Sequence, residues 1–297
     1  MFCFVLGTGC CGSSLVQEIL ARHPDMGFLS NIDDLGALPA AMSSRLSRVN
    51  NAVYRGVQQD WTRKGRARFA PSEGYRALAR EVSPILAFPD RALVAQDADP
   101  WLAARMRRFF QSRARSQGKQ VFLHKFTGHS RAGLIEAVLP GSTFIHIVRD
   151  GRAVAGSLVR QNWWTTRGGQ AESWRNALPL AERQAWESAG RSAPLLAGLA
   201  WQLMIDQHDE ARAELPPDRW LELRYEDVVA APEQAFARML AHVRLEPTAT
   251  FETALKEYSL DPTRSRGFRE ELSPRTLKTL DHHLGAQLRR LGYSVED

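Results

Sequence analysis

The stretch FCFVLGTGCCGSSLVQEIL, residues 2–20, passes from an apolar run through a glycine-rich segment into a second apolar pattern. The run FCFVL predicts a short buried strand over residues 2–6, because no polar residue interrupts it. In the second pattern, apolar side chains recur at helical spacing at Leu15, Ile19 and Leu20. The stretch therefore predicts a strand, a glycine-rich loop and a helix, which is the opening unit of an α/β fold.

The glycine-rich segment has the spacing of a phosphate-binding loop. Gly7 and Gly12 are separated by four residues, but Ser13 stands where a loop that binds nucleoside triphosphates carries lysine. Backbone N–H groups in such a turn, together with the positive end of the following helix, bind phosphate without needing any one side chain. We therefore expect an anion site here, with a plain tight turn as the alternative.

The alternation of strand and helix returns later in the chain. Further strands are expected within residues 23–31, 119–126, 142–150 and 219–228. Helical patterns follow most of them, and strands that are joined by crossover helices form parallel sheets. The expected fold is α/β, with a central, mostly parallel sheet, flanking helices and a ligand at the carboxyl ends of the strands. One domain is expected over residues 1–297.

Two segments depart from this alternation. Residues 35–118 contain helical stretches broken by proline and glycine, with many arginines, and predict a helical insertion that covers one side of the sheet. Residues 162–190 are rich in tryptophan, glycine and arginine and lack a clear period, which predicts an irregular lid. The tail combines a basic loop, DPTRSRGFREE, with a terminal helix.

The composition favours anionic ligands. Lysine and arginine outnumber aspartate and glutamate by 39 to 33, the isoelectric point is about 9.5, and the basic residues are scattered along the chain. This distribution favours a polyanionic small molecule or an acidic acceptor over nucleic acid. Cys3, Cys10 and Cys11 lack the spacing of a disulfide framework or zinc site, which is typical of a cytoplasmic protein. No apolar run approaches the roughly 20 residues that span a bilayer.

Four motifs together carry a family resemblance. In chain order they are GTGCCGSSLVQEILARHPD, FLHKF, FIHIVRDGRAVAGSL and LELRYEDVVAAPE. In order and separation they resemble the sulfotransferases that use 3′-phosphoadenosine 5′-phosphosulfate (PAPS), more closely the bacterial, carbohydrate and tyrosylprotein branches than the cytosolic aryl branch. The resemblance implies a P-loop-like sulfotransferase fold, with PAPS as sulfonate donor and no metal. It covers the sheet and both nucleotide-binding segments but not the insertion or the lid.

The resemblance also implies a set of nucleotide-binding residues. The 5′-phosphosulfate would be wrapped by Gly9, Cys10, Cys11, Gly12, Ser13 and Ser14. The 3′-phosphate would be held by Arg149 and Ser157, which are spaced so that a guanidinium and a hydroxyl from neighbouring elements can reach one phosphate. Tyr225 would lie near the adenosine, and Arg264 and Arg266 stand where the family has a late loop that covers the nucleotide. A surface ion pair is the alternative for Arg149, and core packing is the alternative for Tyr225.

Lys125 is the leading catalytic candidate. It matches a family lysine at the end of FLHKF, from which its ammonium group would stabilise the charge that develops on the sulfonate and the leaving oxygen. The alternative is a solvated lysine at a strand end. The family usually has Arg or Lys in the first loop at the position of Cys10, so this chain lacks that cation. We expect Cys10 to fill the turn and to form no covalent intermediate.

The general base is left open by the sequence. In related branches a glutamate just after the second strand often accepts the proton of the acceptor, but here the segment reads SNIDD. Asp33 and Asp34 are displaced candidates, and the alternative is that they cap a helix. His129 remains in contention because an imidazole titrates near neutral pH, whereas His124 is expected to be structural.

The sequence predicts a sulfotransferase that acts on a hydroxyl or amine of a small molecule, a carbohydrate or a peptide. Trp163, Trp164 and Trp174 would stack on a sugar or aromatic acceptor, or else pack the lid, while arginines of the insertion would favour an acidic acceptor. The rival functions are a P-loop kinase with a degenerate loop and a non-catalytic nucleotide-binding relative. His282 and His283 lack two further ligands, so no metal site is expected. The oligomeric state stays open.

Overall fold

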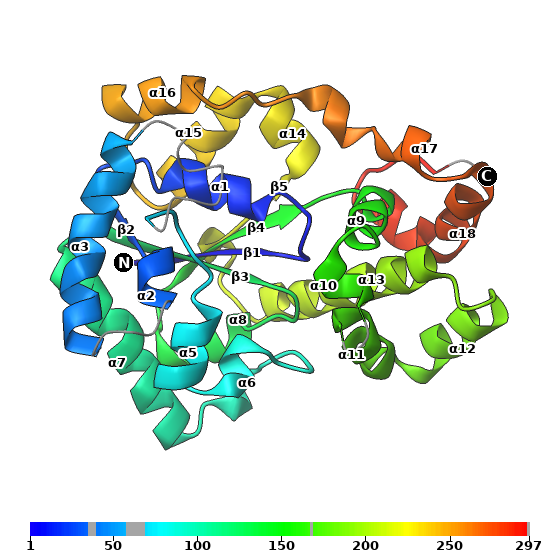
Figure 1. The fold of residues 1–297 in the computed structure, drawn as a ribbon, viewed down its shortest axis with the longest axis horizontal. Helices are drawn as coiled ribbons and strands as arrows, with labels where there is room; N and C mark the ends of the chain where they lie inside the picture. The colour runs from blue at the N-terminus through cyan, green and yellow to red at the C-terminus, as the bar shows by residue number, and fades with distance from the viewer. Residues whose placement is uncertain (35–39, 58–68, 167–168, 296–297) are drawn as a thin grey trace.

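Five strands form a parallel sheet at the centre of the molecule (Figure 1), in a computed structural model that describes all residues except 35–39, 58–68, 167–168 and 296–297. The strands are β1 (Phe2–Gly7), β2 (Met26–Phe28), β3 (Val121–Thr127), β4 (Thr143–Val148) and β5 (Trp220–Arg224). Their order across the sheet is β2-β3-β1-β4-β5, and each neighbouring pair is parallel. The predicted parallel sheet is confirmed, with β1 in its middle.

Both faces of the sheet are covered, and β1 shows why. Cys3 and Val5 belong to one hydrophobic cluster while Phe4 and Leu6 belong to another, because successive side chains of a strand point to opposite faces. All four are fully buried. Helices must therefore lie on both sides, as is usual for parallel sheets.

The helices divide between the two faces. The cluster around Val5 includes residues of α1 (Ser13–Leu20), α14 (Tyr225–Ala230), α15 (Pro232–His242) and α16 (Ala249–Lys256). The cluster around Phe4 includes residues of α5 (Tyr75–Glu81), α6 (Pro84–Ala87), α7 (Pro100–Gln117) and α8 (Ala132–Val138). Figure 1 draws the first group above the sheet and the second group below it.

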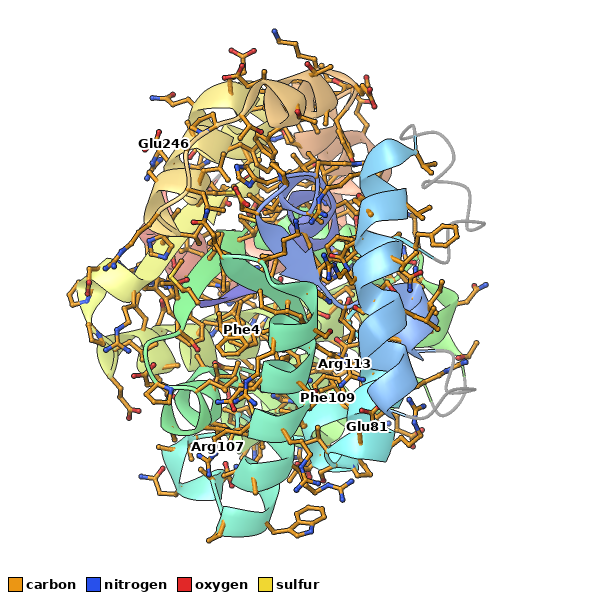
Figure 2. All side chains as sticks on the ribbon, turned by 90° about the vertical axis from the view of Figure 1, so that its left-hand side faces the viewer. Phe4, Glu81, Arg107, Phe109, Arg113 and Glu246 are labelled. Atoms are coloured by element: carbon orange, nitrogen blue, oxygen red, sulfur yellow. The ribbon has the colours of Figure 1, made fainter. Side chains whose placement is uncertain are left out.

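The predicted helical insertion forms the side of the molecule next to β2. Its described parts contain α3 (Ala40–Gly56), α5, α6, the 3₁₀ helix η1 (Ala95–Asp97) and α7. Figure 2 shows α3 and α7 side by side, and both contact β2. The short helix α2 (Asn31–Asp34) lies between β2 and this insertion along the chain.

The expectation of an irregular lid over residues 162–190 is wrong in its secondary structure. The described residues of this segment form three short helices, α10 (Asn162–Thr165), α11 (Gln170–Ala177) and α12 (Leu180–Ser188). Each carries one buried tryptophan, at Trp164, Trp174 and Trp186, in a third cluster with α9 (Gly151–Leu158) and α13 (Ala193–Ala213). Isolated helices of this length are marginal in water, so these three depend on tertiary packing that the local sequence does not record.

The C-terminal part completes the third cluster. The strand predicted within residues 219–228 stops at Arg224, because Tyr225 begins α14. The remaining elements are the 3₁₀ helices η2 (Pro217–Arg219) and η3 (Pro262–Ser265), α17 (Phe268–Glu271) and α18 (Pro274–Arg290). No helix in the described part of the chain is both long enough and apolar enough to cross a bilayer.

Candidate active site

The loop between β1 and α1 has an unusual backbone. Gly9, Cys10 and Gly12 have φ angles of 75°, 50° and 94°, in the left-handed region that favours glycine. A Cβ on Gly12 would lie 2.3 Å from the Tyr225 ring, whereas a Cβ on Gly9 would meet nothing within 4 Å. Within the described part of the chain, the N–H groups of residues 9–12 donate no hydrogen bond. Unpaired N–H groups before a helix N-terminus form a site for an anion.

A charged side chain from β3 lies directly against this loop. The buried Lys125 ammonium group donates to Ser14 Oγ at 2.5 Å and lies 2.6 Å from Glu73 Oε1. The second carboxylate oxygen, Glu73 Oε2, accepts a hydrogen bond from Thr127 Oγ1 at 2.8 Å. The Tyr75 hydroxyl lies 2.9 Å from the same Thr127 oxygen. An ammonium, a carboxylate and two hydroxyls thus meet the loop at the carboxyl end of the central strands.

Glu73 is the residue that sequence reasoning missed. The chain leaves β2 at Phe28, passes through α2 and α3, and returns to the end of β2 where Pro71 bridges Ser30. Glu73 therefore reaches the place where the family resemblance put a glutamate directly after the second strand. Gly74 follows with a φ of 63° and opens α5. The only local signal is a glutamate next to a glycine that precedes a helix, which is too common to single it out.

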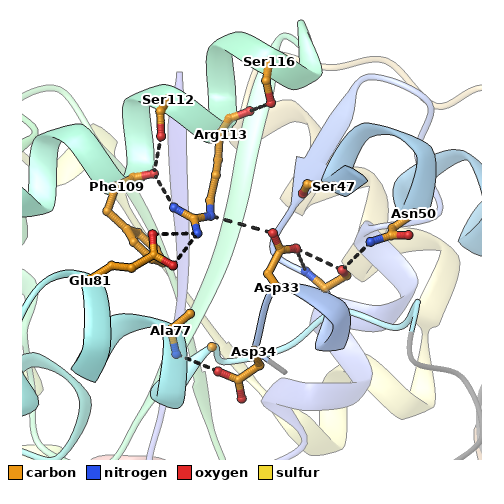
Figure 3. Close-up of polar contacts among 12 residues, drawn as sticks. Asp33, Asp34, Ser47, Asn50, Ala77, Glu81, Phe109, Ser112, Arg113 and Ser116 are labelled. Atoms are coloured by element: carbon orange, nitrogen blue, oxygen red, sulfur yellow. Dashed lines mark hydrogen bonds and ion pairs between the residues drawn. The ribbon is translucent and has the colours of Figure 1, made fainter. Parts of the chain in front are cut away.

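Asp33 and Asp34 are held by structural contacts (Figure 3). Asp33 Oδ2 accepts hydrogen bonds from both the N–H and the hydroxyl of Ser30, each at 2.9 Å, so it caps α2 in the manner of a capping box. Its other oxygen lies 3.8 Å from the buried guanidinium of Arg113. Asp34 Oδ1 accepts from the Ala77 N–H at 2.9 Å and so ties α2 to α5. These contacts favour the capping alternative over the role of base.

The buried Arg113 extends this network. Its guanidinium donates to both carboxylate oxygens of Glu81, at 3.0 and 3.1 Å, and lies 3.8 Å from the centre of the Phe109 ring. One side chain of α7 therefore binds α2 and α5 at once. The segment that carries Glu73 is anchored on the α5 side by these ion pairs.

The two histidines near Lys125 have different surroundings. His129 stacks on Trp174 with 4.0 Å between ring centres, and its Nδ1 lies 3.1 Å from Gln207 Oε1. Burial lowers the pKa of His129 to about 4, so its imidazole is neutral at physiological pH and a weak base. His124 lies fully buried among aromatic rings, as expected for a structural residue, and burial lowers its pKa to about 3.

Arg149 and Tyr225 lie beside the loop. Arg149 donates to the Cys10 carbonyl at 2.8 Å, and its guanidinium lies 4.8 Å from the centre of the Tyr225 ring. Its Nε is buried and has no partner in the described structure. Ser157 is half-buried on α9, and its hydroxyl makes no hydrogen bond with any described residue. The alternative ion pair with Asp150 does not form, because Arg152 occupies that carboxylate at 2.7 Å.

The described part of the late basic loop borders a cavity next to α14. Arg266 lines a large cavity of about 1220 Å³ next to α14, and the described lining of this cavity contains neither Arg149 nor Ser157. Ser265 is buried and donates to the Pro262 carbonyl at 2.5 Å. The Arg264 side chain lies outside the described residues.

Cys10 fills the loop as a thiol. Its side chain is half-buried and packs against the cluster around α9 and α13. Burial raises the pKa of the Cys10 thiol to about 11, an effect larger than the lowering by the nearby Arg149 charge. Beside it, Cys11 is fully buried beneath the loop. In the described part of the chain no three metal-ligating side chains lie together.

A sequence model of the sulfotransferase family matches residues 3–249. The chain belongs to the sulfotransferase family. Members of this family are transferase enzymes. A curated relative, the omega-hydroxy-beta-dihydromenaquinone-9 sulfotransferase Stf3 of Mycobacterium bovis, is 26% identical over 192 residues, which are 63% of this chain and 44% of the relative. The chain thus spans less than half the length of the curated relatives it matches.

Solved structures of sulfotransferases share the fold. The sulfotransferase domain of the Synechococcus PCC 7002 olefin synthase superposes with a TM-score of 0.54 at 15% identity, over 99% of this chain and 95% of that one. The sulfotransferase domain from the curacin biosynthetic pathway has a TM-score of 0.56 at 13% identity, over 99% and 98% of the two chains. Sulfotransferase STF9 from Mycobacterium avium has a TM-score of 0.56 at 16% identity, over 99% and 77%. The predicted sulfotransferase fold is confirmed.

Proposed function

We propose that this protein transfers the sulfonate group of PAPS to a hydroxyl or amine of an acceptor. The observation that carries the proposal is the position of the buried Lys125 ammonium group, between Ser14 in the first turn of α1 and the Glu73 carboxylate. A cation and a base at one point next to an anion-binding loop are what transfer of an anionic group to a hydroxyl needs.

The residues present fit the donor. The unpaired N–H groups of residues 9–12 and the N-terminus of α1 suit the 5′-phosphosulfate. The unpartnered Nε of Arg149 and the Ser157 hydroxyl suit the 3′-phosphate, since a guanidinium binds phosphate through charge-assisted hydrogen bonds. The Tyr225 ring lies against both Gly12 of the loop and the Arg149 guanidinium, where it would contact an adenosine.

Each of the two charged groups has a distinct role in the transfer. PAPS supplies a sulfonate on a phosphate oxygen, which leaves with the electron pair of its bond to sulfur as the acceptor oxygen bonds to sulfur. Lys125 stabilises the charge on that leaving oxygen and on the sulfonate. Glu73 takes the acceptor proton, in place of Asp33 and Asp34, whose carboxylates are bonded elsewhere.

The rival functions lack matching contacts. A P-loop kinase needs a loop lysine and an acidic group for Mg²⁺, but Ser13 holds the first position and the Asp150 carboxylate is occupied by Arg152. A relative that only binds nucleotide would have no use for a buried ion pair of Lys125 and Glu73 next to the loop.

Calorimetry and a transfer assay test the proposal. Adenosine 3′,5′-bisphosphate should bind the protein without metal and more tightly than ATP with Mg²⁺. Arg149→Ala should weaken the bisphosphate by about 1.5–3 kcal/mol, the value of a hydrogen bond to a charged group. The control Arg290→Ala removes an exposed arginine that pairs with Asp209 and should leave the affinity unchanged. The proposal would be contradicted if Arg149→Ala left the bisphosphate affinity unchanged, or if the protein transferred sulfonate from PAPS to none of the acceptors tested.

A further inference from the structure

An aromatic cavity of about 420 Å³ opens next to Glu73. Thr8, Gly9 and Thr127 form the end that faces the loop and the strand ends. Most of the remaining wall is aromatic or apolar, with Tyr75, Phe88, Trp163, Trp164, Trp174 and Met204. The volume lies within the range of small-molecule sites, and such sites have mostly apolar walls with a few placed polar groups.

Two aromatic side chains of this cavity are strongly exposed. Phe88 is 61% exposed and Trp163 is 45% exposed, whereas Trp164 is 1% exposed and Trp174 is 6% exposed. The buried tryptophans therefore form the inner wall, and the exposed pair stands where the cavity meets solvent. Large apolar side chains beside an open cavity are typical of a binding site for an apolar group.

The charges of the cavity disfavour an anion. Among its described lining residues the charged side chains are the carboxylates of Glu73 and Asp90 and the guanidinium of Arg131. Arg131 is 2% exposed, and four of its five N–H donors are used by backbone carbonyls, at 2.8 to 3.1 Å, of Leu86, Ala87, Thr127 and His129. Because Glu73 is paired with Lys125 at 2.6 Å, the Asp90 carboxylate is the lining charge that no described ion pair compensates.

The arginines of the insertion do not supply such a cation from the described residues. Arg113 is committed to Glu81 and Asp33, and Arg105 donates to the carbonyls of Val82 and Arg80. Neither lines the cavity. The earlier expectation that these arginines favour an acidic acceptor thus finds no support in the described residues, while the basic residues of 58–68 lie outside them.

We propose that the acceptor is an uncharged alcohol with an aromatic or alkyl body, which lies against Trp163, Phe88 and the buried tryptophans with its hydroxyl at Glu73. A carboxylate or sulfate on the acceptor is disfavoured by the Asp90 charge and by the mostly apolar wall. This inference rests on the proposed function, because it assigns the acceptor of that same site.

A matched pair of acceptors tests it. Methyl 4-(hydroxymethyl)benzoate and free 4-(hydroxymethyl)benzoate carry the same hydroxyl and ring and differ by one negative charge. With PAPS and the full chain, kcat/KM for the ester should exceed that for the carboxylate by about tenfold or more, because the carboxylate would be desolvated in a mostly apolar cavity beside Asp90. Asp90→Asn should narrow this ratio by about threefold, since the repelling charge is removed. A ratio near one in the wild-type protein overturns the inference.

Variants at the mouth of the cavity give a second readout. Trp163→Ala and Phe88→Ala should each raise KM for the ester by about fivefold, because they remove part of the apolar wall. Both residues are exposed, so folding should be retained. The control Trp101→Ala removes a tryptophan that is 57% exposed and does not line the cavity, and it should leave KM unchanged. An unchanged KM in both cavity variants overturns the inference.

The failure of this inference can be distinguished from failure of the proposed function. If the carboxylate is sulfonated as well as the ester, the transferase activity stands and the acceptor class is wrong. If neither is sulfonated, binding of the ester to protein saturated with adenosine 3′,5′-bisphosphate is measured by tryptophan fluorescence. If the ester binds and Trp163→Ala weakens this binding, the acceptor class is supported and the transfer function is contradicted. If the ester does not bind, the acceptor class is overturned.

Discussion

Replacing Glu73 by glutamine removes the proposed base with little change of shape. In the structure, its two oxygens lie 2.6 Å from Lys125 Nζ and 2.8 Å from Thr127 Oγ1. Glutamine keeps one oxygen for these donors but cannot take a proton from the acceptor. Loss of a positioned general base lowers kcat by a factor of about 10² to 10⁴. That factor corresponds to about 2.7–5.5 kcal/mol of transition-state stabilisation.

The same substitution changes stability far less than activity. Lys125 is buried and loses a carboxylate partner, but it keeps Ser14 Oγ at 2.5 Å and gains an amide oxygen. The free energy of unfolding should therefore fall by about 1–3 kcal/mol, the cost of weakening one buried hydrogen bond to a charged group. The affinity for adenosine 3′,5′-bisphosphate should change by less than about threefold, because the described contacts of the Glu73 carboxylate are with Lys125 and Thr127 and not with Arg149 or Tyr225.

The assay compares three substitutions under saturating PAPS. Initial rates of sulfonated product give kcat, calorimetry gives the bisphosphate affinity, and denaturant unfolding gives stability. Glu73→Asp keeps a carboxylate and should recover part of the activity that Glu73→Gln loses. Asp34→Asn tests the displaced candidate and should keep kcat within about threefold, since its carboxylate accepts from the Ala77 N–H. A full kcat in Glu73→Gln, or a collapse of kcat in Asp34→Asn without loss of fold, refutes the assignment.

Two further predictions concern stability and reactivity. Arg113→Met should lower the free energy of unfolding by about 3–5 kcal/mol in denaturant titrations, because two carboxylates lose their buried cation; a loss below 1 kcal/mol would show that the pairs contribute little. Cys10 should react slowly with iodoacetamide at pH 7.5, because only the thiolate reacts and burial raises the thiol pKa to about 11. The alkylation rate should rise about tenfold for each pH unit and become constant near pH 11. Peptide mass spectrometry measures the labelling of Cys10 over time. An alkylation rate that no longer increases above pH 8 would contradict the raised thiol pKa.

Local patterns in the chain were sufficient for the sheet, the loop and the family. Uninterrupted apolar runs indicated the buried strands, because a strand that is covered on both faces has apolar residues at consecutive positions. The glycine spacing marked the loop, and the structure places positive φ angles at Gly9 and Gly12 within it. The family resemblance assigned Arg149 to the nucleotide site, and the structure puts its side chain against the loop. The short helices α10, α11 and α12 were missed, because isolated helices of this length are marginal and depend on tertiary packing.

The sequence by itself determined that a parallel α/β sheet carries a glycine-rich loop at the end of its first strand, since backbone conformation and hydrophobic periodicity are local properties. Only the tertiary structure decided which carboxylate meets Lys125. The chain departs after β2 and returns at Pro71, so Glu73 is distant along the chain and adjacent in space, while the nearby Asp33 and Asp34 turn to Arg113 and α5. The physical reason is that an ion pair depends on where packed elements bring two side chains, which no periodicity in the sequence records.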